Sequence, residues 1–244
     1  MSEFSHRGDE KKAFVRSIFD DISPQYDFLN HFLSLGVDLY WRRRLVHSLS
    51  LPESGLVLDV ATGTGDVGLA LRKRYPTVRV VGLDYAYRMV VRSRAKTRRK
   101  GVTGFPALQG DGECLPFRDD QFDALTISFG FRNIGHYEVA LEEFARVLKP
   151  GGALRILEFA QPRSRWFGTV YQAYFHHVLP RLGALFSRSD AYRYLPESVD
   201  YFPARQELAA LLAAHRFDHI RIEDLTWGVA TLIQARKPGG AKAS

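Results

Sequence analysis

Short apolar runs alternate with longer amphipathic runs from Gly55 onward. The strand-like runs cover 55–60, 78–83, 105–109, 123–128 and 152–158, and the helix-like runs between them cover 66–74, 87–99 and 137–148. A turn at Pro150-Gly151-Gly152 separates the last helix from the last of these strands. Strands that alternate with helices predict a parallel sheet covered by helices on both faces, which is an α/β fold.

The two ends of the chain depart from this alternation. Apolar residues in 10–22 and 38–49 have helical spacing interrupted by Pro24 and Gly36, so we expect residues 1–50 to form a helical segment in front of the sheet. The chain closes with a helix-like run near 204–215 and strand-like runs at 217–223 and 226–234. Because only Asp224-Leu225 separates these two strands, we expect an antiparallel hairpin.

Residues 161–203 do not follow the alternation. Apolar and aromatic residues form one helical stripe before Pro180, namely Trp166, Phe167, Val170, Tyr171, Tyr174, Phe175, Val178 and Leu179. We expect an insertion at the sheet edge, which either packs as core or caps an apolar substrate pocket. The chain is then a single domain, with a sheet core at 51–160 and 204–236, this cap, and a disordered tail at 237–244.

The composition is that of a soluble globular protein, with 45% hydrophobic and 25% charged residues. No apolar run approaches the roughly 20 residues that span a bilayer, and Met1–Lys12 lacks the apolar core of a secretory signal. The single cysteine, Cys114, excludes an intrachain disulfide. We therefore expect a cytoplasmic protein.

The formal net charge is +7, and much of it lies in Arg42–Arg44 and Arg92–Lys100. These runs fit a solvated helix face, attraction to anionic lipid headgroups, or attraction to nucleic acid. Charge alone does not separate the three interpretations.

A glycine-rich turn, Asp59–Asp66, follows the first strand and precedes a helix. Such a turn brings bare backbone N–H groups close to a ligand, and Gly63 and Gly65 permit the close approach. Its spacing departs from the dinucleotide motif, and the carboxylate of Asp59 suits a cationic sulfonium with an ammonium group better than a pyrophosphate. Asp84 ends the second strand, where a carboxylate can accept bonds from two ribose hydroxyls.

A third acidic position, Asp111, follows the strand-like run 105–109. Its side chain can accept from an adenine amine, although an ordinary turn residue is the alternative. Glu113 and Cys114 are interpreted as scaffold. These positions together predict a site for S-adenosylmethionine.

Family-specific motifs run over residues 13–237. They include Ile18-Phe19, Tyr26-Asp27, Asn30, Ser34-Leu35-Gly36, Trp41-Arg42-Arg43, Leu58–Asp66, Leu115-Pro116-Phe117, Phe122-Asp123, Ile127–Asn133, Arg146–Gly152, Leu157-Glu158-Phe159, Tyr192–Leu195 and Glu197-Ser198-Val199. The chain resembles the menaquinone/ubiquinone biosynthesis C-methyltransferase family, a branch of the class I S-adenosylmethionine-dependent enzymes. The resemblance implies a Rossmann-like, mostly parallel seven-stranded sheet with a C-terminal antiparallel strand.

The resemblance also implies site residues. Thr64, Asp84, Asp111, Gly112 and Ser128 would contact the cofactor, and Gly63 and Gly65 would shape the loop. The chain departs from the family at Thr62, often glycine there, at Tyr85-Ala86, in place of a polar pair, and at Asp111-Gly112, in place of Asn-Ala. None of these changes removes an element of the site.

Methylating a hydroquinone carbon requires an electron-rich ring, which ionisation of a ring hydroxyl supplies. Arg132 and Asn133 follow the fourth strand at its carboxyl end, so we expect them to stabilise the phenolate or orient water. Tyr26 is a second candidate for contact with the ring hydroxyl. A structural salt bridge for Arg132 and a buried core position for Tyr26 are the alternatives. Arg132 cannot act as the base, because its guanidinium stays charged.

The base is unassigned, and a packing role is favoured for His176 and His177. No metal-ligand spacing occurs, and we expect no metal. The function predicted is C-methylation of a prenylated hydroquinone, demethylmenaquinol to menaquinol. The alternatives are a benzoquinol, a sterol or another apolar molecule, and a basic RNA-binding methyltransferase or RNA-binding module. We expect transient contact with the inner face of the membrane and no nucleic-acid partner, since no RNA module is recognisable; a homodimer is left open.

Overall fold

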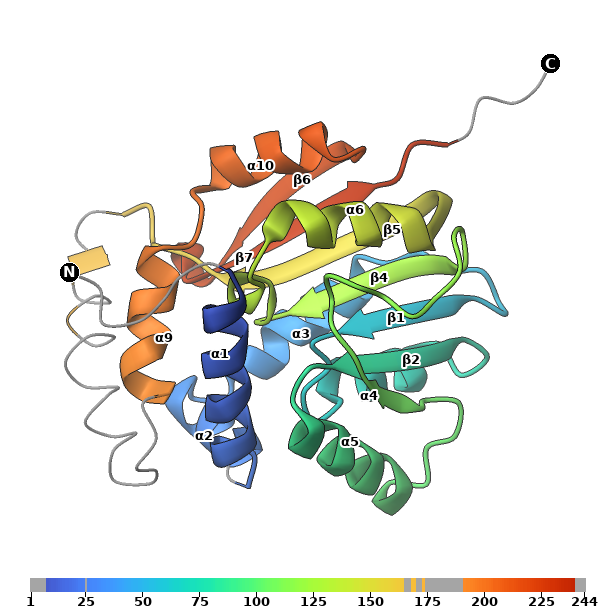
Figure 1. Cartoon of the computed structure of the whole chain (residues 1–244), viewed down its shortest axis with the longest axis horizontal. Coiled ribbons are helices and arrows are strands. Elements are labelled where there is room, and N and C mark those ends of the chain that lie inside the picture. The colour runs from blue at the N-terminus through green and yellow to red at the C-terminus, as the bar shows by residue number, and fades with distance from the viewer. Residues whose placement is uncertain (1–7, 25, 165–167, 170–172, 174–190, 240–244) are drawn as a thin grey trace.

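The computed structural model describes residues 8–24, 26–164, 168–169, 173 and 191–239 (Figure 1). The helices α1 (Gly8–Ile22), α2 (Tyr26–Leu33) and α3 (Val37–His47) precede the first strand, β1 (Leu56–Val60). The next elements are α4 (Asp66–Arg74), β2 (Arg79–Asp84), α5 (Tyr87–Arg99), β3 (Ala107–Gln109), β4 (Phe122–Ser128), the 3-10 turn η1 (Phe131–Asn133), α6 (Tyr137–Val147) and β5 (Leu148–Phe159). The chain closes with α9 (Ala191–Asp200), α10 (Arg205–Ala214), β6 (Asp218–Leu225), the 3-10 turn η3 (Thr226–Gly228) and β7 (Ala230–Arg236).

Within the described residues, seven strands form one sheet in the order β3-β2-β1-β4-β5-β7-β6. The strands from β1 to β5 pair in parallel, and β7 lies antiparallel between β5 and β6. The predicted α/β fold, with its mostly parallel sheet and C-terminal antiparallel strand, is confirmed. So is the antiparallel pairing of the last two strands.

Helices cover both faces of this sheet, as its strand patterns require. One core cluster packs Trp41, Leu45 and Leu71 of α3 and α4 against the sheet. The other packs Phe144 of α6 and Leu212 of α10 against the opposite face. The strands β1 and β4 have buried side chains on both faces, which is typical of parallel strands between two helical layers.

The order of strands reverses between β1 and β4, since β2 and β3 lie on one side of β1 and β5 lies on the other side of β4. In open α/β sheets, ligands bind at such a point, beyond the carboxyl ends of the strands. Figure 1 shows α1, α2 and α9 gathered at this end of the sheet. The N-terminal helices, as well as the loops, therefore contribute to the site.

Several predicted boundaries are wrong. Helix α2 lies between Pro24 and Gly36, inside the helical segment expected at 1–50, although neither of the two runs with helical spacing included it; eight residues are too short for helical periodicity to stand out. Pro150-Gly151-Gly152 lies inside β5 rather than in a turn before it, with Gly151 at a φ of 77°. Asp224 and Leu225 belong to β6, and the connection is η3.

The cap at 161–203 is described only in part. Its C-terminal portion is helix α9, which the sequence did not predict because Pro196 lies inside it. The aromatic stripe at 166–179 falls outside the described residues, apart from 168–169 and 173, as do residues 240–244 of the expected tail.

Candidate active site

A cavity of about 740 Å³, a volume that includes its opening to solvent, lies at the carboxyl edge of the sheet. The loops after β1, β2 and β4 line it, and so does α1. Of the predicted site residues, it brings together Tyr26, Gly63, Asp84, Asp111, Gly112, Ser128 and Asn133. We call it the first cavity.

The glycines of the loop after β1 and the side chain of Asp84 determine the conformation of this loop. The backbone N–H of Gly63 donates to Asp84 Oδ2 over 2.7 Å, with Gly63 at a φ of 56°. Gly65 has a φ of 91°, and a Cβ there would lie 2.7 Å from Ser93 Oγ, so only glycine fits. The glycines therefore shape the loop as the sequence predicted.

Asp84 is buried, and its other oxygen accepts from the N–H of Ala86 over 2.9 Å. Burial raises the pKa of this carboxyl to about 6, although the two backbone donors oppose the shift. Near neutral pH it is an ionised acceptor on the cavity wall, which is what a ribose diol requires.

Asp59 and Thr64 lie outside the lining of the first cavity. Asp59 accepts 2.6 Å bonds from the hydroxyls of Thr62 and Thr126, so its carboxylate braces the loop against β4. Burial raises its pKa to about 6. The hydroxyl of Thr64 donates to Asp27 of α2. In the structure these two residues and Gly65 contact the protein around the loop rather than the first cavity.

Sequence reasoning missed the basic residue at the far wall. Lys12 of α1 lies 2.9 Å from Asp111 Oδ2 and 3.1 Å from Glu113 Oε2, and it lines the first cavity. Glu113, interpreted as scaffold, also accepts from the N–H groups of Gly135 and His136. No local sequence motif predicts that Lys12 belongs to the site, because its partners lie about a hundred positions away in the chain.

A second cavity of about 660 Å³ adjoins the first, and Phe19, Tyr26 and Phe129 line both. The second cavity is largely aromatic and aliphatic, with polar groups from Asn30, Ser34, Asp38, Arg42 and Arg132. Arg42 lies 5.2 Å from the centre of the Phe129 ring, and Arg132 lies 5.4 Å from that of Phe159. Two cations therefore face an apolar chamber beside the first cavity.

Arg132 is fixed by the sheet itself. Its Nη1 lies 2.6 Å from Glu158 Oε1 and donates to the carbonyl of Phe129 over 2.7 Å, while its Nε lies 3.3 Å from Ser198 Oγ of α9. It forms the salt bridge that the sequence left as an alternative, and it also lines the second cavity.

Tyr26 lines both cavities, whereas Asn133 lines the first. Burial raises the pKa of the Tyr26 phenol, and Arg42 and Arg132 oppose the shift, so the hydroxyl is a neutral donor near pH 7. Asn133 lines the first cavity, and its Oδ1 accepts from Tyr194 over 3.3 Å. His176 and His177 lie outside the described residues.

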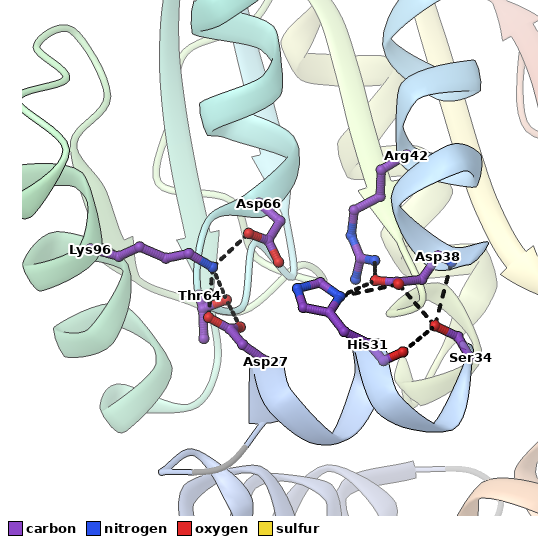
Figure 2. A network of polar contacts seen from close by, with 8 residues as sticks. All are labelled: Asp27, His31, Ser34, Asp38, Arg42, Thr64, Asp66 and Lys96. Atoms are coloured by element: carbon purple, nitrogen blue, oxygen red, sulfur yellow. Dashed lines mark hydrogen bonds and ion pairs between the residues drawn. The ribbon is translucent and has the colours of Figure 1, made fainter. Parts of the chain in front are cut away.

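Two polar networks connect α2 to the rest of the site (Figure 2). Lys96 of α5 lies 2.6 Å from Asp27 Oδ2 and also pairs with Asp66 at the start of α4. On the other side, His31 Nδ1 lies 2.9 Å from Asp38 Oδ2, and Asp38 pairs with Arg42. Both networks pin α2 over the glycine-rich loop.

The first cavity fits S-adenosylmethionine by its own chemistry. The buried Ser128 Oγ has no hydrogen-bond partner among the described residues and lines the cavity. The Asp84 carboxylate and the Asp111-Gly112 turn supply acceptors and close backbone, while Met89, Ile127 and Ile134 supply apolar wall. In the described portion of the chain, no group of three His, Cys, Asp or Glu side chains could hold a metal ion. No helix of that portion is long and apolar enough to cross a membrane.

Comparison with known proteins decides the family. Residues 6–237 match the ubiE/COQ5 methyltransferase family. The chain belongs to this family. It is 46% identical over 234 residues to the ubiquinone/menaquinone biosynthesis C-methyltransferase UbiE of Geobacter sulfurreducens, covering 95% of this chain and 91% of that protein. It is 49% identical over 222 residues to the demethylmenaquinone methyltransferase of Thermus thermophilus, covering 91% of this chain and all of that protein.

Solved structures show the same fold at low sequence identity. An S-adenosylmethionine-dependent methyltransferase from Aquifex aeolicus has a TM-score of 0.61 at 19% identity, covering 80% of this chain and 89% of that one. The [4+2]-cyclase SpnF has a TM-score of 0.71 at 18% identity, covering 98% and 100%. The fold alone therefore does not determine the reaction. Family membership makes this chain a methyltransferase, and family and fold together imply S-adenosylmethionine as its methyl donor.

Proposed function

We propose that this methyltransferase transfers a methyl group to a ring carbon of demethylmenaquinol, a prenylated hydroquinone, and so forms menaquinol. The pair of adjoining cavities carries the proposal, because Phe19, Tyr26 and Phe129 form a wall common to both. The relatives from Thermus thermophilus and Deinococcus radiodurans named as demethylmenaquinone methyltransferases support this substrate.

The first cavity holds the cofactor in this proposal. Asp84 accepts from the ribose, Asp111 and Gly112 contact the adenine, and Ser128 makes a polar contact. Gly63 and Gly65 shape the loop after β1. Thr64 connects this loop to α2, and Asp59 connects it to β4. S-adenosylmethionine supplies an electrophilic methyl group on a cationic sulfur.

The second cavity holds the ring. Arg132 and Arg42 stabilise the quinol phenolate, and their pairing with Glu158 and Asp38 fixes them in place while reducing the effect of their charges. The hydroxyl of Tyr26 orients the ring at the common wall, and the amide of Asn133 approaches it from the first cavity. Aromatic walls pack against the ring faces and exclude water. The carbon–sulfur bond of the donor breaks as the methyl group joins the ring carbon, and that carbon then gives its proton to water, so that the ring regains aromaticity.

One experiment tests substrate class. Purified protein with labelled S-adenosylmethionine is given reduced demethylmenaquinol, a demethylated benzoquinol, a sterol, and total RNA. We expect label in menaquinol. Label only in the sterol or RNA would refute the quinol assignment, and label in both quinols would broaden it.

The protein also contacts the membrane surface transiently in this proposal, since a prenylated quinol lives in the bilayer. Trp227 is 74% exposed and Tyr201 is 57% exposed, and the net charge of +7 attracts anionic headgroups. Flotation with anionic vesicles should fall as salt rises, and Trp227→Ala should weaken it further. Salt-independent flotation would contradict this. The homodimer stays a prediction, which light scattering would check.

A further inference from the structure

A third cavity, of about 720 Å³, shares the lining residue Phe159 with the second cavity. Its walls are largely apolar and come from three parts of the fold: Val199, Phe202 and Pro203 at the end of α9, Leu208 of α10, and Ile233 of β7. It is distinct from the cofactor site, and nothing in the methyl transfer itself uses it.

Helix α9 connects the second and third cavities. Tyr194 and Leu195 line the second cavity, and Val199 lines the third. Leu195 and Val199 are one helical turn apart, roughly 6 Å along the axis. Phe159 lines both cavities, so its ring is a floor common to the two chambers. The second and third cavities therefore share Phe159 and are lined by positions one turn apart on α9.

Polar side chains at the rim of the third cavity pair with one another, and the interior is left apolar. Arg205 Nε lies 2.7 Å from Asp224 Oδ1 and its Nη1 donates to the carbonyl of Gln161 over 3.1 Å. The side chain of Gln161 donates to Asp200 Oδ1 over 3.1 Å. Charged groups at the rim are thus engaged with one another and do not mark a site for a charged ligand.

One interior group is an exception. Thr231 is 3% exposed, and its Oγ1 has no hydrogen-bond partner among the described residues although it lines the cavity. A buried hydroxyl without a partner costs free energy. The exposed aromatic residues Tyr201 and Trp227 lie next in sequence to the rim contacts Asp200 and Gly228.

We propose that the third cavity binds the isoprenoid tail of the quinol, which runs from the ring in the second cavity, over Phe159 and under α9, to leave beside Tyr201 and Trp227. This inference rests on the proposed function. It assigns the tail to a defined protein site rather than to the bilayer alone, and burying an apolar chain there contributes to substrate affinity in proportion to the area removed from water.

The test compares two demethylated naphthoquinols, one with a long isoprenoid tail and one with none, as substrates of the full-length protein in detergent micelles. For the wild type, kcat/KM should be higher with the tail. Ala160→Phe fills the cavity, because Ala160 lines it and keeps its backbone bond to Val229. It should lower kcat/KM roughly tenfold for the tailed quinol and leave the tailless quinol unchanged. Ala210→Phe, exposed on α10 and not lining the cavity, is the matched control.

Two further variants guard against misfolding. Ala204→Trp places bulk at an exposed lining position, so a folded protein with the same selective loss is expected. Thr231→Val keeps the shape of the wall and removes a hydroxyl that is already closed to solvent, so the protein should stay folded and both quinols should keep their wild-type KM. Equal effects on both quinols, or no effect of any filling variant on the tailed one, would overturn the tail site. Equal methylation of both quinols by the wild-type protein would also overturn the tail site, and it would leave the proposed function intact. If the wild-type protein methylates neither quinol, the proposed function itself is refuted.

Discussion

Arg132 and Glu158 form an ion pair that is almost closed to solvent, with Nη1 2.6 Å from Oε1 and side-chain exposures of 6% and 0%. Glu158 lies near the end of β5, and Arg132 follows β4, the neighbouring strand. The backbone N–H of Arg132 also donates to Glu158. The cation that faces the second cavity is thus positioned by a carboxylate of the sheet.

The first prediction separates the structural and catalytic roles of Arg132. Arg132→Gln should lower kcat about 100-fold, the scale for losing one preorganised electrostatic donor. It should also cost about 3–5 kcal/mol in the free energy of unfolding, because Glu158 is left as a buried, unpaired charge. Steady-state kinetics and denaturant unfolding measure the two effects.

The double variant Arg132→Gln with Glu158→Gln is the control. Removing both charges should restore most of the free energy of unfolding without restoring kcat. If kcat recovers together with stability, Arg132 acts on the fold alone and makes no electrostatic contribution to the reaction.

The second prediction concerns pH. The pKa of the Asp84 carboxyl is raised to about 6 by burial, so the group is mostly protonated at pH 5 and mostly ionised at pH 7.5. If only the ionised form accepts both ribose hydroxyls, affinity for S-adenosylmethionine should fall roughly tenfold between pH 7.5 and pH 5. Calorimetry across this range measures it.

Asp84→Asn is the matched variant. It should weaken binding at pH 7.5 and flatten the pH dependence. Asp59 has a pKa raised to about 6 as well, so any residual slope in Asp84→Asn is assigned to Asp59 by repeating the series in Asp59→Asn. A wild-type affinity that does not change with pH would refute the assignment of Asp84 to the ribose.

The parts of the site that the sequence predicted are those encoded locally. Asp84 ends β2 and the glycines of the 59–66 loop follow β1, so both lie at the carboxyl ends of neighbouring parallel strands. Ser128, at the end of β4, was placed by resemblance and lies in the same cavity wall. A parallel sheet brings such positions together at one edge whatever the rest of the chain does.

The parts that were missed depend on contacts across long stretches of chain. Lys12 meets Asp111, and Lys96 meets Asp27, only because α1 and α2 fold back over the sheet edge. Sequence spacing carries no signal for these contacts.

The third prediction concerns the contact between α5 and α2. Lys96→Gln removes the cation shared by Asp27 and Asp66, and two like charges then remain beside the glycine-rich loop. Affinity for S-adenosylmethionine should fall roughly fivefold, a modest effect because both carboxylates are partly exposed. Backbone amides of α2 should exchange faster with deuterium. Arg98→Gln, exposed on the same helix and outside the pocket that Lys96 and Asp27 line, is the control and should change neither. Unchanged exchange in Lys96→Gln would show that α2 is held by other contacts.

The last prediction concerns Tyr26, which lines both main cavities. Tyr26→Phe keeps the ring that packs against Phe19, with centroids 5.9 Å apart, and removes only the hydroxyl. If that hydroxyl donates to the quinol oxygen as negative charge develops, kcat should fall about tenfold, within the range for a lost hydrogen bond to a charged group. Affinity for S-adenosylmethionine and the thermal midpoint should stay near wild type, because the hydroxyl does not hold the loop.

Tyr194→Phe is the matched control for Tyr26→Phe: it removes another buried phenol, one that donates to Asn133. Similar kcat losses in both variants would assign the effect to the general polarity of the chamber. A wild-type kcat in Tyr26→Phe would remove the hydroxyl from the mechanism and leave Tyr26 as wall alone.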